Sequence, residues 1–404
     1  MKHDKELEKL IAAEKYRQAT TIDLIPSENL APLAVREIVS SVLMNKYSEG
    51  YPGRRYYPGN AIIDQIELLA QNRAKKLFKL RGAWHVNVQP YSGSPANMAV
   101  YLGLLNFGDT ILGMQLSAGG HLTHGHKVNF SGMAYKSVSY GVDSKTDLLD
   151  YNEILKIARR VKPKIIISGL TAYPRTIDFK KFGEIAADVR ALHLADISHI
   201  AGLVAAGLHV SPFPYADVVT MTTHKILRGP RGAVIFAKSN LAEKINRAVF
   251  PGIQGGPHDN TTAAIAYTLK AAAEPRYKVY AKKVVANANV LAHALKKEGF
   301  SLVTGGTDNH LLLIDLSPLG MTGKDAETRL EKSSIIANRN TVPGDEKAFN
   351  PSGIRMGTPA VTTRGMGVRD MRQVAEWIRR AVIDKENPAS ISREIKSFLK
   401  KFPV

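Results

Sequence analysis

A lysine follows an apolar segment near the middle of the chain, in a setting that could make its amine reactive. The segment is Val218-Val-Thr-Met221, and it continues into Thr222-Thr-His-Lys225 and a glycine-containing turn. A lysine buried at a strand end loses its charge readily and becomes a nucleophile towards carbonyl groups. The alternative is an ordinary surface lysine after a strand. Lys225 is therefore a candidate for attachment to an aldehyde.

Two further clusters of polar residues could carry chemistry, one after an apolar run and one before a helical run. Asp196-Ile-Ser-His199 follows Leu192-His-Leu-Ala, and Tyr91-Ser-Gly-Ser-Pro-Ala-Asn97 precedes the helical run from Met98 to Leu105. Successive backbone N–H groups at a helix start, with serine hydroxyls beside them, suit a phosphate. The alternatives are a helix N-cap with a hydrogen-bonded histidine for the first cluster and an ordinary capped helix for the second.

Together the three clusters fit one ligand, pyridoxal phosphate. Its aldehyde suits Lys225, its pyridine nitrogen suits Asp196, and its phosphate suits Ser92, Gly93 and Ser94. A carboxylate beside the nitrogen keeps the ring protonated, and the protonated ring stabilises a carbanion at a substrate α-carbon. The sequence therefore predicts a pyridoxal-phosphate enzyme with Lys225 as its Schiff-base lysine.

The elements that would position these clusters alternate between helices and short apolar strands. Strands are expected at 110–114, 164–168, 192–196, 217–221 and 233–236, with helices at 154–161 and 182–189 between them. This alternation predicts an α/β fold with a mostly parallel sheet covered by helices on both faces, and ligands in such sheets bind beyond the carboxyl ends of the strands.

The flanking regions differ from this pattern. Residues 2–19 predict an amphipathic arm, and 22–58 predict mostly irregular backbone. A linking helix is expected at 261–298, followed by a strand at 310–315 and helices at 324–333, 367–384 and 389–401. The expected division is an N-terminal arm and inter-subunit segment (1–58), a large cofactor-binding domain (59–270) and a small C-terminal α/β domain (271–404).

Composition excludes several classes of chemistry. The 404 residues include no cysteine, which excludes disulfides, thiolate nucleophiles and Cys-ligated metal sites, and no metal site is predicted. The N-terminus is too charged for a secretory signal, and no apolar stretch approaches the roughly 18 to 20 residues that span a bilayer, so a soluble cytoplasmic protein without a membrane partner is expected. The net charge of +19 permits polyanion binding. Without a recognised nucleic-acid motif, no specific nucleic-acid partner is expected.

Several longer strings are similar to the serine hydroxymethyltransferase family, in order along nearly the whole chain. They are Leu24-Ile-Pro-Ser-Glu-Asn29, Asn45-Lys-Tyr-Ser-Glu-Gly-Tyr-Pro-Gly-Arg-Arg-Tyr-Tyr57, Gly119-Gly-His-Leu-Thr-His-Gly125, Thr222-Thr-His-Lys225 with Gly229-Pro-Arg-Gly232, Gly305-Gly-Thr-Asp-Asn-His310 and Ser352-Gly-Ile-Arg-Met-Gly-Thr-Pro359. The resemblance implies a fold-type-I pyridoxal-phosphate transferase with a mostly parallel, seven-stranded-type central sheet. The implied reaction interconverts L-serine and glycine and passes the one-carbon unit to a reduced pterin, either tetrahydrofolate or tetrahydromethanopterin. The alternative within this chemistry is a threonine or allo-threonine aldolase.

The resemblance also implies a homodimer, or a tetramer, whose subunits share active sites. Residues that would reach the partner's cofactor are Tyr47, Glu49, Tyr56, Tyr57 and the Gln254-Gly-Gly256 loop. Glu49 is the implied acid and base at the hydroxymethyl group and the pterin, and Tyr57 guides the departing aldehyde. Arg355, helped by Ser27, would bind the substrate carboxylate, a task that suits a guanidinium fork.

The remaining site residues are also implied by the resemblance. His121 would stack on the cofactor ring, and His199 and Thr171 would lie at its phenolic oxygen, with Thr222 and Arg231 also binding the cofactor. The implied phosphate ligands are Ser92, Gly93, Ser94, His224, Tyr47 and Gly256. The implied pterin-pocket residues are Leu116, Gly120, Leu122 and Asn340. Departures from the family pattern are Pro58, Pro95, Thr171 and a loop at 344–351 that is one residue short.

Overall fold

The computed structural model describes residues 4–345 and 350–404, so four residues of the shortened 344–351 loop lie outside the described chain. Backbone contacts divide the chain into two compact units. The sheet unit comprises residues 31–282, and the terminal unit comprises the described residues up to Leu30 together with Lys283–Val404. The expected boundaries after residues 58 and 270 differ from this partition, which divides the expected N-terminal segment between Leu30 and Ala31.

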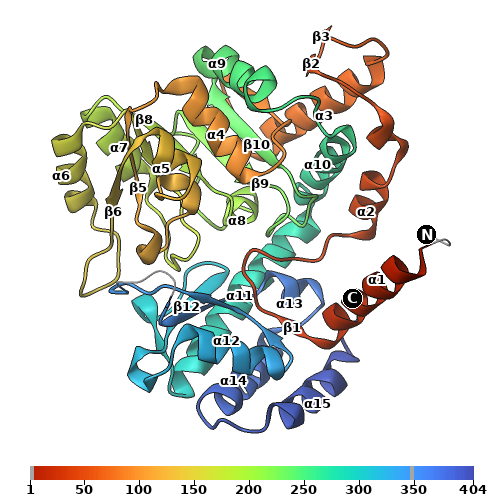
Figure 1. The fold of residues 1–404 in the computed structure, drawn as a ribbon, viewed down its shortest axis with the longest axis vertical. Helices are drawn as coiled ribbons and strands as arrows, with labels where there is room; N and C mark the ends of the chain where they lie inside the picture. The colour runs from red at the N-terminus through yellow and green to blue at the C-terminus, as the bar shows by residue number, and fades with distance from the viewer. Residues whose placement is uncertain (1–3, 346–349) are drawn as a thin grey trace. The chain divides into compact units, whose positions relative to one another are not determined.

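A seven-stranded sheet forms the centre of the sheet unit (Figure 1), and its strand order is β4-β10-β9-β8-β7-β5-β6. β10 runs antiparallel to both of its neighbours, and the other strand pairs are parallel. The expected mostly parallel sheet is therefore confirmed. The bounds are β4 Trp84–Asn87, β5 Thr110–Met114, β6 Lys136–Tyr140, β7 Ile165–Ile167, β8 Leu192–Asp196, β9 Val218–Thr222 and β10 Ala233–Lys238.

Helices cover both faces of this sheet because its buried strands are apolar on both sides. On one face, Ala96 and Val100 of α4 pack with Ile235 of β10. On the opposite face, Phe236 of β10 contacts Phe78 and Phe213 at ring-centroid distances of 5.3 and 5.1 Å. The helices of this unit are α2 Leu33–Val39, α3 Ala61–Leu77, α4 Gly93–Leu104, α5 Phe130–Ala134, α6 Tyr151–Val161, α7 Phe179–Asp188, α8 Ala201–Ala205, α9 Ala242–Arg247 and α10 Asp259–Ala272.

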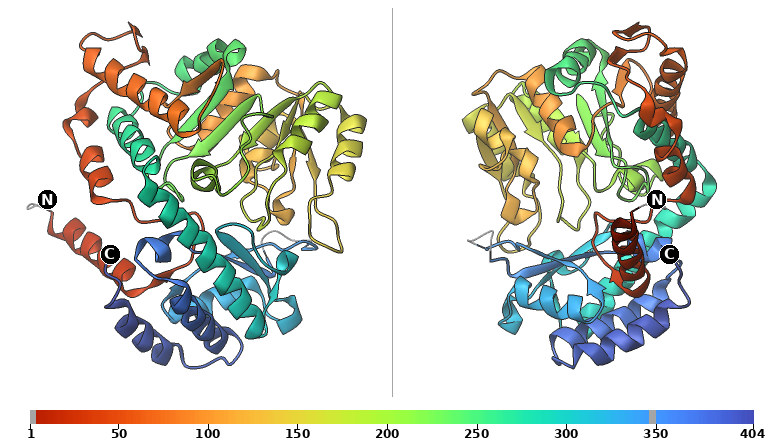
Figure 2. Two further views of the ribbon diagram at one scale, coloured as in Figure 1. Left: turned by 180° about the vertical axis from the view of Figure 1, so that it is seen from behind. Right: turned by 45° about the vertical axis from the view of Figure 1, so that its right-hand side comes forward.

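The expected linking helix at 261–298 is two helices, which corrects that prediction. α10 ends at Ala272, and α11 (Pro275–Lys297) begins at a proline. Proline lacks the N–H that would continue α10, whereas the first position of a new helix needs no such donor. In the views of Figures 1 and 2, α10 lies beside α3.

The terminal unit contains an antiparallel sheet of order β11-β12-β15-β14, the smaller C-terminal sheet of the predicted fold. Its strands are Ser301–Leu302, Leu311–Asp315, Gly353–Gly357 and Asn338–Asn340, in that order, and β1 (Ile22–Asp23) pairs with β13 (Ile335–Ile336). The helices are α1 Lys5–Thr20, α12 Gly323–Lys332, α13 Pro359–Thr363, α14 Val368–Val382 and α15 Pro388–Leu399. No helix within residues 4–345 and 350–404 is both long enough and apolar enough to cross a membrane.

Candidate active site

Lys225 lies three residues beyond the end of β9 in a loop that closes on itself. The backbone N–H of Gly229 donates to the carbonyl oxygen of Thr223 (2.8 Å), and the Thr223 hydroxyl donates to the carbonyl oxygen of Pro230 (2.6 Å). The Lys225 residue is buried, with 9% of its surface exposed. The alternative of an ordinary surface lysine is therefore wrong.

Asp196 ends β8, and three donors surround its carboxylate. Oδ2 accepts hydrogen bonds from Asn97 Nδ2 (2.9 Å) and His124 Nε2 (3.1 Å), and Oδ1 accepts one from the backbone N–H of Ser198 (3.0 Å). Burial by itself raises the pKa of the carboxyl, but hydrogen bonds and the His124 charge outweigh burial and leave the pKa of Asp196 below its usual value. Asp196 does not cap the following helix, because the N-cap of α8 is Ile200. The carboxylate is thus held in its charged form.

The helix α4 begins beside these two strand ends. The backbone N–H groups of its first turn receive no hydrogen bond from the side chain of its N-cap residue. Ser92 is the N-cap residue, in extended backbone, and its side chain makes no capping hydrogen bond. A Cβ atom added at Gly93 would lie 2.8 Å from Cγ2 of Thr222, so the glycine allows the helix start to meet the end of β9. The structure therefore does not have an ordinary capped helix here, because the Ser92 side chain accepts no hydrogen bond from the first backbone N–H groups of α4.

Hydrogen bonds join the three clusters into one site at the carboxyl ends of the parallel strands. Thr222 donates through its backbone N–H to Ser198 Oγ (3.2 Å) and through its hydroxyl to the carbonyl oxygen of Ser198 (3.3 Å). The side chain of Asn97, on α4, reaches Asp196 on β8 and accepts from Thr220 Oγ1 on β9 (2.8 Å). The three sequence clusters are therefore neighbours, as expected for one ligand site.

Asn97, His124 and Ser198 are site residues for which the sequence predicts no role, although all three lie within the motifs described above. Their partners are remote in the chain, because Asn97 and His124 lie 99 and 72 residues from Asp196. The sequence did offer one sign of such a role: Asn97 is a polar residue within the apolar run Ala96-Asn-Met-Ala-Val100 of α4. Asn97 is 1% exposed and His124 is 3% exposed.

His224 carries a buried polar atom that suits an additional ligand. Its Nδ1 is buried and has no hydrogen-bond partner among the residues that the structure describes. Burial, followed by the positive charges of Lys225 and Arg231, lowers the pKa of His224 to about 3, so the ring is neutral at neutral pH. Arg231 itself is exposed.

The 119–125 segment and Thr171 form a second group of predicted cofactor and pterin residues. The Thr171 hydroxyl donates to the carbonyl oxygen of Gly120 (2.9 Å), and Thr123 Oγ1 lies 2.7 Å from His121 Nδ1. Gly120 is obligatory, because a Cβ atom there would collide with the carbonyl oxygen of Met114. His199 is buried, Leu116 is half-buried, and Leu122 is exposed.

The tyrosine-rich segment that was expected to reach a partner subunit is a short two-stranded ribbon, β2 (Gly50–Tyr51) and β3 (Arg54–Arg55). Next to it, the side chains of Tyr47, Tyr56 and Tyr57 are exposed. A Cβ atom at Gly255 would lie 3.3 Å from Glu49 Oε1, and one at Gly256 would lie 3.5 Å from the Tyr47 ring. The ribbon and the Gln254–Gly256 loop therefore form one surface of the sheet unit.

Three predicted site residues, Ser27, Asn340 and Arg355, belong to the terminal unit. Arg355 lies on β15, and its guanidinium donates to Asn338 Oδ1 on the adjacent strand (3.3 and 3.2 Å). Burial lowers the pKa of Arg355 to about 10, so it remains protonated at neutral pH. Asn340 donates to the carbonyl oxygen of Thr341 (2.7 Å), and Ser27 is half-buried in the turn after β1.

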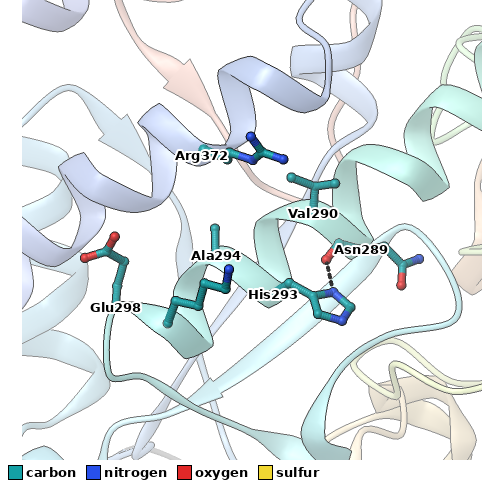
Figure 3. Close-up of a pocket in the computed structure, with 7 residues that line it drawn as sticks. Asn289, Val290, His293, Ala294, Glu298 and Arg372 are labelled. Atoms are coloured by element: carbon teal, nitrogen blue, oxygen red, sulfur yellow. Dashed lines mark hydrogen bonds between the residues drawn. The ribbon is translucent and has the colours of Figure 1, made fainter.

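A groove of about 590 Å³ on the terminal unit is separate from all of these residues (Figure 3). It lies between α11 and α14 and is lined by residues that include His293 and Arg372. The ring of His293 donates to the carbonyl oxygen of Asn289 (2.7 Å). None of the residues predicted from sequence lines this groove. Within the described ranges, no cluster of three histidine or acidic side chains could hold a metal ion.

The fold and the site define an α/β enzyme with a buried lysine, a charged carboxylate and an open helix N-terminus at the carboxyl ends of parallel strands. The chain belongs to the serine hydroxymethyltransferase family, because the family model of that description matches residues 1–378. Family membership confirms the predicted family, the fold class and the predicted activity, that of a serine hydroxymethyltransferase. It also favours the transferase over the aldolase alternative.

Curated relatives named serine hydroxymethyltransferase match the chain over nearly its full length. The relative from Acidothermus cellulolyticus is 53% identical over 98% of this chain and 94% of its own. The relative from Desulfotalea psychrophila is 55% identical over 99% of this chain and 94% of its own. The relative from Sorangium cellulosum is 53% identical over 99% of this chain and 95% of its own.

Proposed function

We propose that the chain interconverts L-serine and glycine with pyridoxal phosphate attached through Lys225, and passes the one-carbon unit to a tetrahydropterin. The pterin is tetrahydrofolate or tetrahydromethanopterin. The observation that carries the proposal is the convergence of a buried amine, a carboxylate held charged by three donors and an uncapped helix start. When bound, the cofactor supplies an electron sink for a carbanion at the substrate α-carbon.

The residues around Lys225 fit the three polar groups of this cofactor. The lowered pKa of Asp196 keeps a negative charge available for a protonated pyridine nitrogen. Phosphate binding is assigned to the first N–H groups of α4, with Ser92, Gly93 and Ser94, and to the neutral ring of His224. Roles at the ring and its phenolic oxygen are proposed for His121, His199 and Thr171, and further cofactor contacts for Thr222 and Arg231.

Substrate binding is assigned to Arg355 with help from Ser27. The bonds to Asn338 orient the Arg355 guanidinium, and its charge at neutral pH suits a bidentate pair with the substrate carboxylate. Proton transfer at the hydroxymethyl oxygen and at the pterin is assigned to Glu49, and guidance of the departing aldehyde to Tyr57. The pterin would contact Leu116, Gly120, Leu122 and Asn340.

A homodimer with shared active sites is the proposed assembly. In support, Tyr47, Tyr56 and Tyr57 expose 53, 74 and 45% of their surfaces, although large aromatic side chains are usually buried. These rings, Glu49 and the Gly256 loop would serve the cofactor of the partner subunit. Sedimentation velocity at micromolar concentration is expected to show the dimer or a tetramer, and a monomer that retains full activity would refute shared sites.

The function is tested by assaying serine cleavage with each pterin in turn. Glycine formation is expected to accelerate with either tetrahydrofolate or tetrahydromethanopterin. If neither pterin accelerates it and threonine is cleaved well, the protein acts as an aldolase. The cofactor site is tested separately: purified protein should carry a yellow chromophore that borohydride reduces, and Lys225→Ala should lack it. A colourless wild-type protein that pyridoxal phosphate does not restore would overturn the cofactor assignment.

A further inference from the structure

Gln254 forms a buried clamp on the turn that leads into α4. Its Nε2 donates to the carbonyl oxygen of Gln89 (3.0 Å), and its Oε1 accepts from the backbone N–H of Tyr91 (3.0 Å). The two backbone groups flank Pro90, whose ring restricts the backbone between them. Gln254 is 7% exposed, so both backbone groups would lose their partners inside the protein if this amide were removed.

Tyr91 extends the same joint to the end of the Gln254–Gly256 loop. Its hydroxyl donates to the carbonyl oxygen of Gly256 (2.7 Å). Its ring stacks on His258 with a centroid distance of 4.2 Å and an interplanar angle of 6°. The Gln254–Gly256 loop is therefore hydrogen-bonded to the Gln89–Tyr91 turn through both its first and its last residue. About 165 residues separate Tyr91 from Gly256 in the chain.

Gln89 connects this turn to the ribbon that begins immediately after Glu49. Its Nε2 donates to the carbonyl oxygen of Gly50 (2.9 Å) and lies 3.1 Å from each carboxylate oxygen of Glu67. Arg55 donates to the same Gly50 carbonyl (2.9 Å) and pairs with Glu67 (2.7 Å). Gln89 is 3% exposed, and Gly50 is the immediate neighbour of Glu49. The position of Glu49 is thus connected to the turn before α4 through the Gln89 side-chain amide, with a second link where Asn87 donates to the Tyr51 hydroxyl (3.1 Å).

We propose that Gln89 and Gln254 are positioning residues that hold the Tyr47–Gly50 segment leading into the ribbon, the Gln254–Gly256 loop and the start of α4 in one fixed arrangement. This inference rests on the proposed function, in which each of the three segments carries cofactor or substrate groups. The two glutamines position different segments. Gln254 positions the two phosphate-binding segments, and Gln89 positions the ribbon that presents Glu49.

This division predicts different kinetic signatures for Gln254→Met and Gln89→Met, which keep side-chain length and remove the amide. In full-length enzyme titrated with pyridoxal phosphate, Gln254→Met should weaken cofactor binding about tenfold, because displacing the helix start costs the charged phosphate about one hydrogen bond from it. Gln89→Met should lower kcat about 10- to 100-fold, as displacement of a catalytic group does, and change the cofactor Kd by less than about threefold. Equal effects of both variants on both quantities would overturn the division.

Gln71→Met is the matched control. Gln71 Nε2 also contacts Glu67 (3.3 Å), but Gln71 is half-buried, lies one helical turn after Glu67 on α3 and makes no described bond to the ribbon or the loop. Both kcat and the cofactor Kd should stay within about threefold of wild type for a bond of this kind. If Gln71→Met reproduces the loss of kcat seen with Gln89→Met, Gln89 acts through general stability of the Glu67 network, and the positioning role is refuted.

A double-mutant cycle tests whether Gln89 acts through Glu49. In a Glu49→Gln background, Gln89→Met should lower kcat by less than about twofold, because the group it positions is already gone. Fully additive losses contradict the proposal. If Glu49→Gln alone leaves kcat unchanged, the proposed role of Glu49 fails, and the cofactor titration of Gln254→Met still decides the clamp.

Tyr91→Phe covers the case in which the methionine variants do not fold. It removes only the hydroxyl that reaches Gly256, on a half-buried side chain. A rise of the pyridoxal-phosphate Kd by about threefold or more, with an unchanged melting temperature, supports the joint. An unchanged Kd overturns it.

Discussion

The environment of Asp196 predicts that replacing Asn97 by aspartate reverses the local pH dependence of stability. Asn97 Nδ2 lies 2.9 Å from Asp196 Oδ2, so the added carboxylate would face an existing one within a buried site. Two like charges 4 Å apart repel by about 4 kcal/mol at an effective dielectric of 20. That repulsion raises the pKa of the added carboxyl from about 4 to about 7.

The sign of the effect follows from the protons bound in each state. In the wild type, Asp196 has a lowered pKa, so it stabilises the folded state above the unfolded pKa, and this contribution disappears as the pH falls. In Asn97→Asp, the folded state binds one additional proton on the pair of facing carboxyls. Stability is therefore lost as the pH rises, by about 2 kcal/mol between pH 5 and pH 7 for one group whose pKa is about 4 unfolded and about 7 folded.

Urea unfolding of the cofactor-free protein at pH 5, 6, 7 and 8 measures this slope. Asn97→Leu is the control, because it loses the same hydrogen bonds and adds no titrating group. We expect Asn97→Asp to unfold at lower urea concentration at pH 7 than at pH 5, and Asn97→Leu to follow the wild-type slope. If Asn97→Asp and Asn97→Leu have the same pH slope, the inferred closeness and burial of the two carboxylates are wrong.

Three further outcomes are expected. Arg355→Lys should raise KM for serine about 10- to 100-fold in steady-state assays, because a point charge replaces the fork that Asn338 orients, and an unchanged KM would exclude a bidentate role. Gly120→Ala should lower the melting temperature by several degrees, since its Cβ collides with the Met114 carbonyl oxygen and about 1 to 3 kcal/mol of strain follows; an unchanged melting temperature contradicts that contact. Burial lowers the pKa of His193 to about 4, so the wild type should lose stability as the pH falls from about 6.5 to 4, and His193→Gln should show a smaller loss in the same urea series.

Local sequence determined the elements whose residues are buried on both sides. The apolar runs at 110–114 and 192–196 coincide with β5 and β8. A strand buried on both faces reads as a continuous apolar run, so its position is visible without any knowledge of its partners. The same reasoning placed Lys225 and Asp196 at strand ends and serine residues at a helix start.

Elements with polar or weakly patterned sequences were not predicted. β6 (Lys136–Tyr140) is an edge strand with largely exposed residues, and β4 (Trp84–Asn87) exists through pairing with β10, about 150 residues later. Edge strands carry polar residues, and their pairing is a long-range property that no local window contains. The division of the linking helix at Pro275 was visible locally, because proline begins helices more readily than it continues them.

The sequence by itself determined which residues could do chemistry here: Lys225 and Asp196 are recognisable from residue type and from the apolar runs before them, and the Ser-Gly-Ser turn from the helical run after it. Only the tertiary structure decided that these residues share one site, that Asn97 and His124 keep Asp196 charged, and that Gln89 and Gln254 join the surrounding segments. The reason is physical. These hydrogen bonds join residues that lie 39 to 165 positions apart in the chain, and the contacts to Asp196 set the charge of a side chain that residue type leaves open.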